Sequence, residues 1–562
     1  MLLNNNSKND KRLIAKTKFK NLIIIVFLFI AYFGHSCQKK QQLPNILSSQ
    51  EEDSHYIPDF SYAGYHWGED AIPNREPNVN VADYGAVPDD RKDDTEAIKK
   101  ALEAAHKMDG NVVLSFPPGR FIVKDILYIQ RSNFVLRGAG SGRNGTSLYF
   151  PKSLNDLPLP EDMQELEEYL RVNNKIQSID DLGVEVPYSL YAWTGGFIWT
   201  RVKGKRIKPY MKKYNTKPKV LAQIENGVRG EHILKVNNSN KLNVGDIVSI
   251  NWYNTEGPQS SLIDHIYDNQ DVKVGSRHWD NPNSPLVTQE VTITEIENNK
   301  IHIKSPLMHD IRPEWKPVIT EWKHIEEVGI ENLSIDFPYD LYNAHHVADG
   351  YNAIFLTGLA HSWVRNVKVN NGDNCLLSED CANVTIQDVE TTGRNYHYTI
   401  EMGTVYNMLA ENITVNAPCL HSLSFNTGAR RCVFTNCDIN IQPTLDQHSG
   451  ANMQNLFDNI SMIDKEPFHS FITGGGAGYW KPSHGAFSTF WNIQIRFDYP
   501  NPSNNPIKIE GIQDGPSARL VGVNANYPVE ISYGPNTYKE GINQADFVLP
   551  SLYEYQLEQR IE

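Results

Sequence analysis

The stretch VADYGAVPDDRKDDTEAI occupies residues 81–98, and FPPG follows at residues 116–119. Between them, apolar residues recur at the spacing of one helical face, so we predict a helix that begins near Asp93. Asp93 stands three residues before Glu96, which suits a helix N-cap, and Asp109-Gly110 ends the helix. Residues 112–116 then predict a buried strand, and the Pro-Pro-Gly that follows predicts a turn.

These motifs resemble the N-terminal signature of the pectate-lyase-like superfamily of right-handed parallel β-helices. The resemblance covers about 45 residues and rests on Asp83-Tyr84-Gly85-Ala86, Asp93-Asp94-Thr95, Ala97-Ile98 and Phe116-Pro117-Pro118-Gly119. It implies an all-β solenoid whose first coil is capped by the N-terminal helix. It does not imply a reaction, because lyases, hydrolases and phage adhesins share this fold.

A repeat in the second half of the chain predicts the same architecture. Asn followed by residues that favour strands recurs at intervals of 17 to 34 residues, at Asn332, Asn366, Asn383, Asn412, Asn436, Asn459 and Asn492. A constant core unit with variable loops is typical of a β-solenoid. Asn tolerates a left-handed turn, so we predict structural roles for these residues.

The chain divides into four parts on this basis. We predict a lipoprotein signal peptide over residues 1–36, a tether over 37–75 and the β-helix over 76–562, with an inserted β-module at about 155–320. The module either forms one side of a ligand-binding groove or only packs against the β-helix without contacting a ligand. A short helix at residues 550–560 is expected to cap the last coil.

The N-terminus indicates export. Six basic residues precede an apolar run at residues 22–33, which is too short for an ordinary membrane span and is typical of a signal peptide. Cys37 follows at once and resembles the lipidated cysteine of bacterial lipoproteins; cleavage by ordinary signal peptidase is the alternative. We therefore expect an exported protein, anchored to the outer membrane only through lipid. Lys39-Lys40 favours the periplasmic side over the cell surface.

Composition narrows the function classes. The 562 residues are 40% hydrophobic and 21% charged, which excludes a wholly disordered or collagen-like chain. A net charge of −14 argues against a nucleic-acid partner. Five irregularly spaced cysteines beyond Cys37 indicate neither a disulfide framework nor a zinc site. We predict no metal or cofactor, with Ca²⁺ kept open because carboxylates can hold it against a substrate, and we expect a monomer.

One row of residues is a candidate site. Asp349, Asp373, His397 and His421 are each 24 residues apart, so a constant coil length would place them on successive rungs about 4.8 Å apart. His448 and His484 begin similar local patterns. A solvated or capping histidine ladder is the structural alternative.

Basic and aromatic residues accompany this row. They are Arg394, Tyr396, Tyr398, Arg430, Trp480 and Lys481. Aromatic faces suit sugar rings, whereas Arg and Lys suit carboxylate or sulfate groups. Together with Asp349, Asp373, His448 and His484 they predict a groove for an anionic glycan.

Two reactions suit such a groove. The blocks around Asp349, Asp373 and His397 resemble those of polygalacturonase-type hydrolases, but Asn374 stands where that family has a second Asp, and Tyr-His-Tyr replaces Gly-His-Gly. Because inverting hydrolysis needs two carboxyl groups, this departure puts hydrolysis in doubt. The other reaction is β-elimination at a uronic acid. It would use His397 and His421 with Tyr396 or Tyr398 as base and acid, and Arg394, Arg430 or Lys481 to neutralise the carboxylate.

The C-terminal half also resembles a Bacteroidetes β-helix family that includes an ulvan-oligosaccharide dehydratase. The resemblance covers roughly residues 320–562 and rests on stretches at residues 446–450, 454–457, 484–486 and 489–492. It implies a carbon–oxygen lyase that forms a 4,5-unsaturated uronic acid at the non-reducing end of an ulvan-type oligosaccharide. An endo-acting polysaccharide lyase, a polygalacturonase-like hydrolase and a non-catalytic glycan-binding lipoprotein are the alternatives.

Overall fold

The computed structural model describes most of the chain after residue 42. The described residues are 43–48, 56–173, 175–179, 183–205, 218–257, 260–275, 283–341, 344–448, 450–467, 471–475, 478, 481–503, 505–545, 547 and 549–562. The predicted signal peptide, Cys37 and Trp480 lie outside these residues. Among the described residues, no helix is long and apolar enough to span a bilayer.

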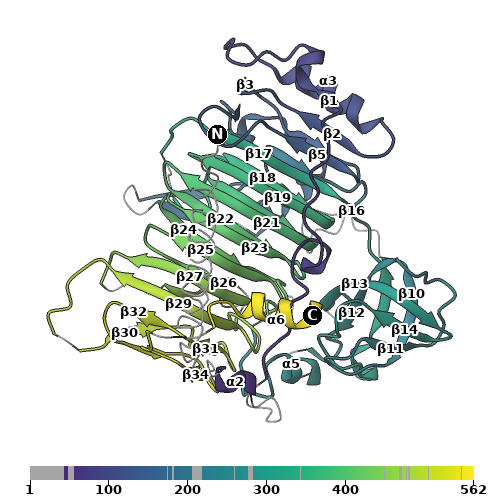
Figure 1. Cartoon of the computed structure of the whole chain (residues 1–562), viewed down its shortest axis with the longest axis vertical. Helices are drawn as coiled ribbons and strands as arrows, with labels where there is room; N and C mark the ends of the chain where they lie inside the picture. Colours follow the sequence, from purple (N-terminus) through teal and green to yellow (C-terminus); the bar gives the residue numbers. More distant parts are fainter. Residues whose placement is uncertain are drawn as a thin grey trace, which may run out of the picture.

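Two long parallel sheets form the body of the molecule (Figure 1). Sheet 1 runs in the order β1 (Val79–Asn80), β2 (Val112–Ser115), β5 (Phe134–Arg137), β17 (Val328–Asp336), β19 (Leu359–Asn370), β21 (Ala382–Thr392), β23 (Leu409–Val415), β25 (Val433–Ile439), β27 (Leu456–Asp464), β29 (Thr489–Phe497), β31 (Arg519–Val521) and β34 (Tyr538–Glu540). Beside this path lie β3 (Gly119–Ile122), β6 (Thr146–Tyr149), β16 (Ile325–Glu326) and β32 (Asn524–Ala525).

Sheet 2 carries several of the candidate site residues predicted from the sequence. Its order is β4 (Leu127–Ile129), β9 (Ile198–Thr200), β18 (Asn352–Thr357), β20 (Asn374–Glu379), β22 (Tyr396–Gly403), β24 (Cys419–Phe425), β26 (Leu445–His448) and β28 (Ile472–Gly475). From β17 to β29, successive strands of the chain alternate between the two sheets, and an apolar core fills the space between them. The predicted right-handed parallel β-helix is therefore confirmed.

The repeated asparagines have the predicted structural role. All seven adopt positive φ angles, from 49° at Asn459 to 59° at Asn332. Side-chain amides bond to the next Asn in the stack, at 2.7 Å between Asn366 and Asn332 and at 2.8 Å between Asn492 and Asn459. The repeated Asn thus marks a left-handed turn in each of these coils, and an amide hydrogen bond links some of the turns to the one before, whereas Asn383 donates to the Tyr62 carbonyl and Asn412 to Asp388.

The N-terminal helix is α3 (Thr95–His106), which buries Ile98, Ala101 and Leu102. Asp93 accepts hydrogen bonds from the backbone N–H and hydroxyl of Thr95, at 3.1 and 2.6 Å. The N-cap position itself belongs to Asp94, whose carboxylate instead accepts from the backbone N–H groups of Val87 and Ile122. The acidic motif thus fastens the cap to the first coil.

The segment expected as a tether is shorter than predicted, because residues 56–75 pack against sheet 1. Phe60, Ala63 and Tyr65 are buried there, and Asn383 donates to the carbonyl of Tyr62 at 2.8 Å. In the short 3-10 turn Tyr65–Gly68, His66 Nε2 lies 2.7 Å from the carboxylate of Glu327. A short helix, α2 (Asn45–Ser48), precedes this segment.

The inserted module is a closed barrel beside the β-helix (Figure 1). Its strands are β10 (Val220–Asn226), β11 (Ile233–Val236), β12 (Ile247–Tyr253), β13 (Pro285–Glu297), β14 (Lys300–Ile303) and β15 (Val318–Glu321), with α5 (Ser261–Ile266). Its apolar core continues into Ala360, Ala382 and Tyr406 of the β-helix. Before it come α4 (Gln164–Val172) and the antiparallel pair β7 (Ile176–Ile179) and β8 (Val184–Pro187).

The C-terminal helix differs in position from the prediction. α6 (Leu552–Ile561) lies against sheet 1, with Leu552 and Tyr553 packed on Val433, Leu456 and Trp491, so it does not cap the last coil. Asp458 of β27 accepts from the N–H of Leu552 at 2.8 Å. The strand pair β30 (Ile507–Glu510) and β33 (Val529–Ser532) belongs to the final coils.

Candidate active site

Five histidines come together in the middle strands of sheet 2 and in the connection beside them. His397 lies in β22, His421 in β24 and His448 at the end of β26, whereas His345 and His346 lie between β17 and β18. Ring centroids are 4.7 Å apart for His345 and His397, 5.3 Å for His397 and His421, and 4.7 Å for His421 and His448. These five residues are called the histidine cluster below.

Asp446 of β26 orients one side of the cluster. Its carboxylate is fully buried, with Oδ2 2.5 Å from His448 Nδ1 and 3.3 Å from His421 Nδ1. Ser424 donates its hydroxyl to the same oxygen at 2.6 Å. Burial alone would raise the pKa of Asp446, but the two imidazoles outweigh it, and the pKa is lowered. An ionised Asp446 favours a proton on the Nδ1 that faces it. The His448 Nδ1 is within hydrogen-bond distance, whereas His421 Nδ1 faces the same oxygen at 3.3 Å without hydrogen-bond geometry.

Tyr398 joins this side of the cluster. Its ring stacks on that of His421, with centroids 4.6 Å apart and planes inclined by 23°. The two residues are direct partners on neighbouring strands, which explains the stacking. Asn426 donates to the Tyr398 hydroxyl at 3.3 Å. A phenol and an imidazole therefore stand next to each other, which is the arrangement that proton transfer to and from one ligand requires.

The other side consists of His345, His346 and His397. Burial, and then the neighbouring histidines, lower the pKa of His345 to about 4 and that of His346 to about 3. Burial, and then the neighbouring histidines, also lower the pKa of His397 well below its usual range. His397 Nδ1 lies 2.7 Å from the carbonyl oxygen of Ala192, so Nδ1 carries the proton and donates it. These imidazoles are neutral at physiological pH.

The segment that contains Ala192 covers one end of the cluster. The His346 ring packs on Tyr188 and Trp193, with centroids 4.4 and 5.4 Å away. Asn374 at the start of β20 lies within 3.4 Å of the carbonyls of Tyr191 and Ala192. Residues 188–195 therefore lie across the first rungs of the row. On the other side, 12% of the His421 side chain and 15% of the His448 side chain are exposed.

The predicted row of four residues is only partly in register. The pairing of Asn374 with Tyr398 sets Asp373 beside His397, as expected. His421, however, pairs with Tyr398 and not with His397, because this coil is one residue shorter than the one before it. Asp349 is also displaced, since Asn352 pairs with Asn374. Because the number of residues per coil varies, the equal 24-residue spacing in the sequence does not place all four residues at equivalent positions of successive strands.

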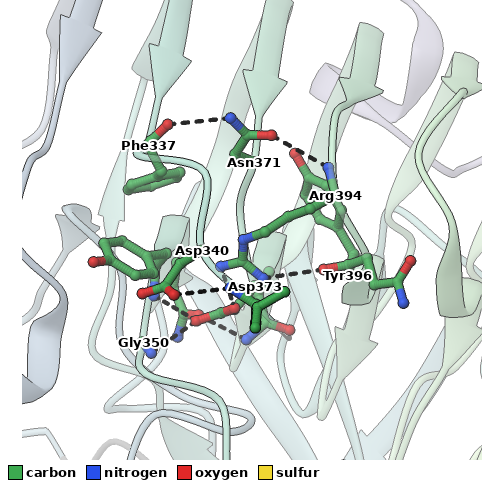
Figure 2. Close-up of polar contacts among 12 residues, drawn as sticks. Phe337, Asp340, Gly350, Asn371, Asp373, Arg394 and Tyr396 are labelled. Carbon is green, nitrogen blue, oxygen red and sulfur yellow. Dashed lines mark hydrogen bonds and ion pairs between the residues drawn. The ribbon is translucent and has the colours of Figure 1, made fainter. Parts of the chain in front are cut away.

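Asp373 and Arg394 form a buried ion pair (Figure 2). Arg394 Nη2 donates to Asp373 Oδ1 at 2.6 Å, and the N–H groups of Gly350 and Tyr351 donate to Oδ2, each at 2.8 Å. Asp373 is 2% exposed and Arg394 is 6% exposed. Because both side chains are almost fully buried and are paired with each other, neither faces a substrate carboxylate, and the predicted binding role of both is corrected to a structural one.

Two other predicted residues also point into the protein. The hydroxyl of Tyr396 donates to the carbonyl of Val369 at 3.0 Å, and burial raises the pKa of Tyr396 well above its usual range. Arg430 is 2% exposed and donates to Thr288 Oγ1 of the barrel at 2.8 Å. Tyr396 is thus excluded as acid or base, and Arg430 joins the inserted module to the β-helix.

The remaining predicted residues lie at different distances from the cluster. His484 is buried, with Nδ1 2.6 Å from the carbonyl of Gly485 and Nε2 2.8 Å from the Tyr533 hydroxyl, so it is a packed core residue. Lys481 Nζ donates to Ser483 at 2.8 Å and lies 3.3 Å from Asp514, at the edge of the β28 rung. Asp349 is half-buried, and burial followed by the charge of Asp373 raises its pKa.

Three residues of the site were not predicted. They are His345, His346 and Asp446. A local signal existed for each, since the two histidines are adjacent and Asp446 stands two residues before His448. The Asp-x-His spacing within a strand places both side chains on one face, which is the geometry that the structure shows.

A polar hollow of about 660 Å³ lies elsewhere, against sheet 1, with Arg120, Arg143 and Lys368 in its lining. Its acidic residue Asp336 accepts from Ser147 at 2.6 Å, and Lys368 pairs with Glu390. Asp336 and Lys368 are thus paired within the protein, and we take the histidine cluster as the candidate active site.

Comparison with known proteins supports the fold of the N-terminal part. Residues 78–156 match the family model "Rhamnogalacturonase A/epimerase, pectate lyase-like". Alginate lyase 7 of Azotobacter vinelandii is 42% identical over 69 residues, a match that covers 11% of this chain and 8% of that enzyme. The chain therefore spans only a small part of this curated relative.

The solved structures that align with this chain have low sequence identity to it. The tailspike protein gp49 from Pseudomonas phage LKA1 is 12% identical, with 83% of this chain and 81% of that chain covered and a TM-score of 0.44. The Yersinia enterocolitica family 28 exopolygalacturonase is 12% identical, with 83% and 78% covered and a TM-score of 0.35.

Proposed function

We propose that this protein is a carbon–oxygen lyase that acts by β-elimination on a uronic acid residue of an anionic oligosaccharide. The observation that carries the proposal is the group formed by Asp446, His421 and Tyr398. It combines an imidazole that faces a buried carboxylate at 3.3 Å with a phenol stacked against it. Elimination at a uronic acid needs such a base and such an acid side by side.

We assign the roles of base and acid to His421 and Tyr398. His421 Nε2 takes the proton from C5 of the uronic acid, and the electron pair of that C–H bond forms the C4–C5 double bond. The bond between C4 and its oxygen breaks, and the leaving oxygen takes the electron pair and a proton from the Tyr398 hydroxyl. The charge that develops on the substrate carboxylate must be stabilised, and Lys481 is the cation of the predicted set that keeps some exposure, with a 34% exposed side chain.

The described residues favour elimination over hydrolysis. An inverting hydrolase needs one carboxyl group as acid and a second as base. Both carboxylate oxygens of Asp373 accept hydrogen bonds, from Arg394 and from two backbone N–H groups. Its neighbour Asn374 has no carboxyl proton to transfer. Asp446 is enclosed by His421, His448 and Ser424. The cluster supplies imidazoles in place of a carboxyl pair.

Among the possible lyase reactions, we favour that of a dehydratase. In that reaction the leaving group is the hydroxyl on C4 of the terminal sugar, and it departs as water. The segment of residues 188–195, held by Asn374 and packed on His346, closes the row at one end, which suits action on a chain end. The resemblance of the C-terminal half to the ulvan-dehydratase family agrees with this choice. We therefore propose ulvan-type oligosaccharides as substrates.

The test is ultraviolet absorbance combined with mass spectrometry, on ulvan-derived and pectin-derived oligosaccharides incubated with the purified protein. We expect a new conjugated-alkene absorbance together with the loss of one water and no chain cleavage. The same absorbance with shorter products would replace the dehydratase with a chain-cleaving lyase. Shorter products that gain water, without absorbance, would contradict elimination. No change on any substrate would favour a glycan-binding protein.

A further inference from the structure

One half of the histidine cluster has no part in the proton transfers proposed above. His345, His346 and His397 each offer one ring nitrogen, and these three atoms lie within 4.8 Å of one another. The rings of His345 and His346 stack with centroids 3.6 Å apart, and both pack on His397. Burying three neutral imidazoles together costs free energy unless their ring nitrogens have a binding partner.

His397 provides the second observation. The residue is fully buried, and its Nδ1–H donates to the carbonyl of Ala192, so Nε2 holds a lone pair. Within the described part of the chain, this Nε2 and Nδ1 of His346 are buried without a hydrogen-bond partner. A histidine that gives one ring N–H to a backbone carbonyl and leaves the other nitrogen bare has the arrangement of a metal ligand.

We propose that His345, His346 and His397 bind a divalent transition-metal ion, zinc in the first place. Three imidazole ligands with a fourth position open is a known form of a zinc site that acts in catalysis. Nitrogen donors favour zinc and related ions, whereas Ca²⁺ and Mg²⁺ prefer oxygen, so the calcium kept open from the sequence does not suit this group. Zinc–nitrogen bonds of about 2.0–2.1 Å require nitrogens roughly 3.3 Å apart, which side-chain rotations of rings whose nitrogens already lie within 4.8 Å can reach.

The role of the ion rests on the proposed function. His421 lies beside the site, with its ring centroid 5.3 Å from that of His397 and 5.9 Å from that of His345. A cation there would face a substrate carboxylate while His421 takes the adjacent proton. Beside Lys481, it would supply the further positive charge that Arg394 and Arg430, both buried in ion pairs or hydrogen bonds, cannot offer.

Metal binding is tested without any substrate. The full-length protein is freed of metal with a chelator and titrated with Zn²⁺ by calorimetry and with Co²⁺ by visible absorption. We expect one ion per chain and a melting temperature that rises with ion concentration. The double variant His345→Gln, His346→Gln changes loop residues only, and we expect at least a hundredfold weaker binding from it.

Two further variants locate the ion. Glu295 and Glu297, both exposed, form a group with the half-buried His302 on the barrel, and His421, Asp446 and His448 form the second group within the cluster. We expect His302→Gln to bind zinc as the unchanged protein does, and Asp446→Asn to keep one ion per chain. No binding, or binding that only His302→Gln or only Asp446→Asn removes, would overturn the proposed site.

The two proposals fail separately. If zinc binds one to one but no oligosaccharide is changed, the metal site stands and the proposed lyase does not. If the metal-free protein eliminates at the same rate as the zinc-loaded protein, the lyase stands and the role of the ion in it is refuted.

Discussion

Replacing Asp446 with Asn tests the proposed base most sharply. The carboxylate receives Nδ1–H of His448 at 2.5 Å, faces His421 Nδ1 at 3.3 Å and also receives the Ser424 hydroxyl at 2.6 Å. Asn has nearly the same shape but no charge, and its NH₂ group can only donate. If that group faces the imidazoles, Nδ1 must accept, and Nε2 then carries the proton and is no longer a base.

The magnitude follows from the contacts that are lost. A hydrogen bond to a charged group contributes about 1.5–3 kcal/mol. With one short bond and one longer contact at stake, the transition state should lose about 3–5 kcal/mol. Since each 1.36 kcal/mol corresponds to a tenfold change in rate, kcat/KM should fall about 10²–10⁴-fold.

The assay is the appearance of the unsaturated product, with the imidazole tautomers followed by nitrogen NMR. Ser424→Ala is the matched control, because it removes a bond to the same oxygen without affecting either imidazole; we expect less than a tenfold loss. Asp446→Asn should shift the proton of His448 from Nδ1 to Nε2. A folded Asp446→Asn protein with unchanged tautomers and activity within threefold of the original would refute the reasoning.

Three further predictions concern stability. Asn374→Asp places a carboxylate against the carbonyls of Tyr191 and Ala192, so we expect a loss of about 2–4 kcal/mol in chemical denaturation, and an unchanged midpoint would contradict this account. Arg394→Met leaves Asp373 buried without its ion pair and should cost about 3–5 kcal/mol; the double change with Asp373→Asn should recover much of it, and a double variant less stable than the single one would disprove the pairing argument. The hydrogen bond with Glu327 is the main cause that raises the pKa of His66 in the folded protein. The stabilising effect of His66 is therefore complete below the unfolded pKa of about 6.5 and is lost as pH rises through the folded pKa. The difference in unfolding free energy between the protein and His66→Gln should shrink from pH 5.5 to pH 9, and a constant difference would contradict this reasoning.

Local motifs were sufficient to predict the architecture. The acidic stretch before α3 forms specific bonds to the first coil, and each repeated Asn adopts the left-handed turn that its side chain tolerates. Both features act over short distances along the chain or between identical positions of successive coils. A sequence pattern therefore carries nearly all the information that they need.

The site depends on features that no local pattern contains. His421 was expected beside His397 but pairs with Tyr398, because one coil is a residue shorter than its neighbour. Arg394 and Arg430 were expected to face a substrate, yet each meets a partner from elsewhere in the chain. His345 and His346 reach the cluster from the connection between β17 and β18, whose course the sequence repeat does not describe.

Isotope labelling tests the central claim most directly. Ulvan-derived oligosaccharides, reduced at their original reducing end, are incubated with the protein in water enriched in ¹⁸O, and the products are weighed by mass spectrometry. Elimination by dehydration takes no atom from the solvent, so the account predicts a product lighter by one water and free of ¹⁸O. A shorter product that carries one ¹⁸O at the cleaved bond, without the absorbance of a new double bond, would show hydrolysis and contradict the account.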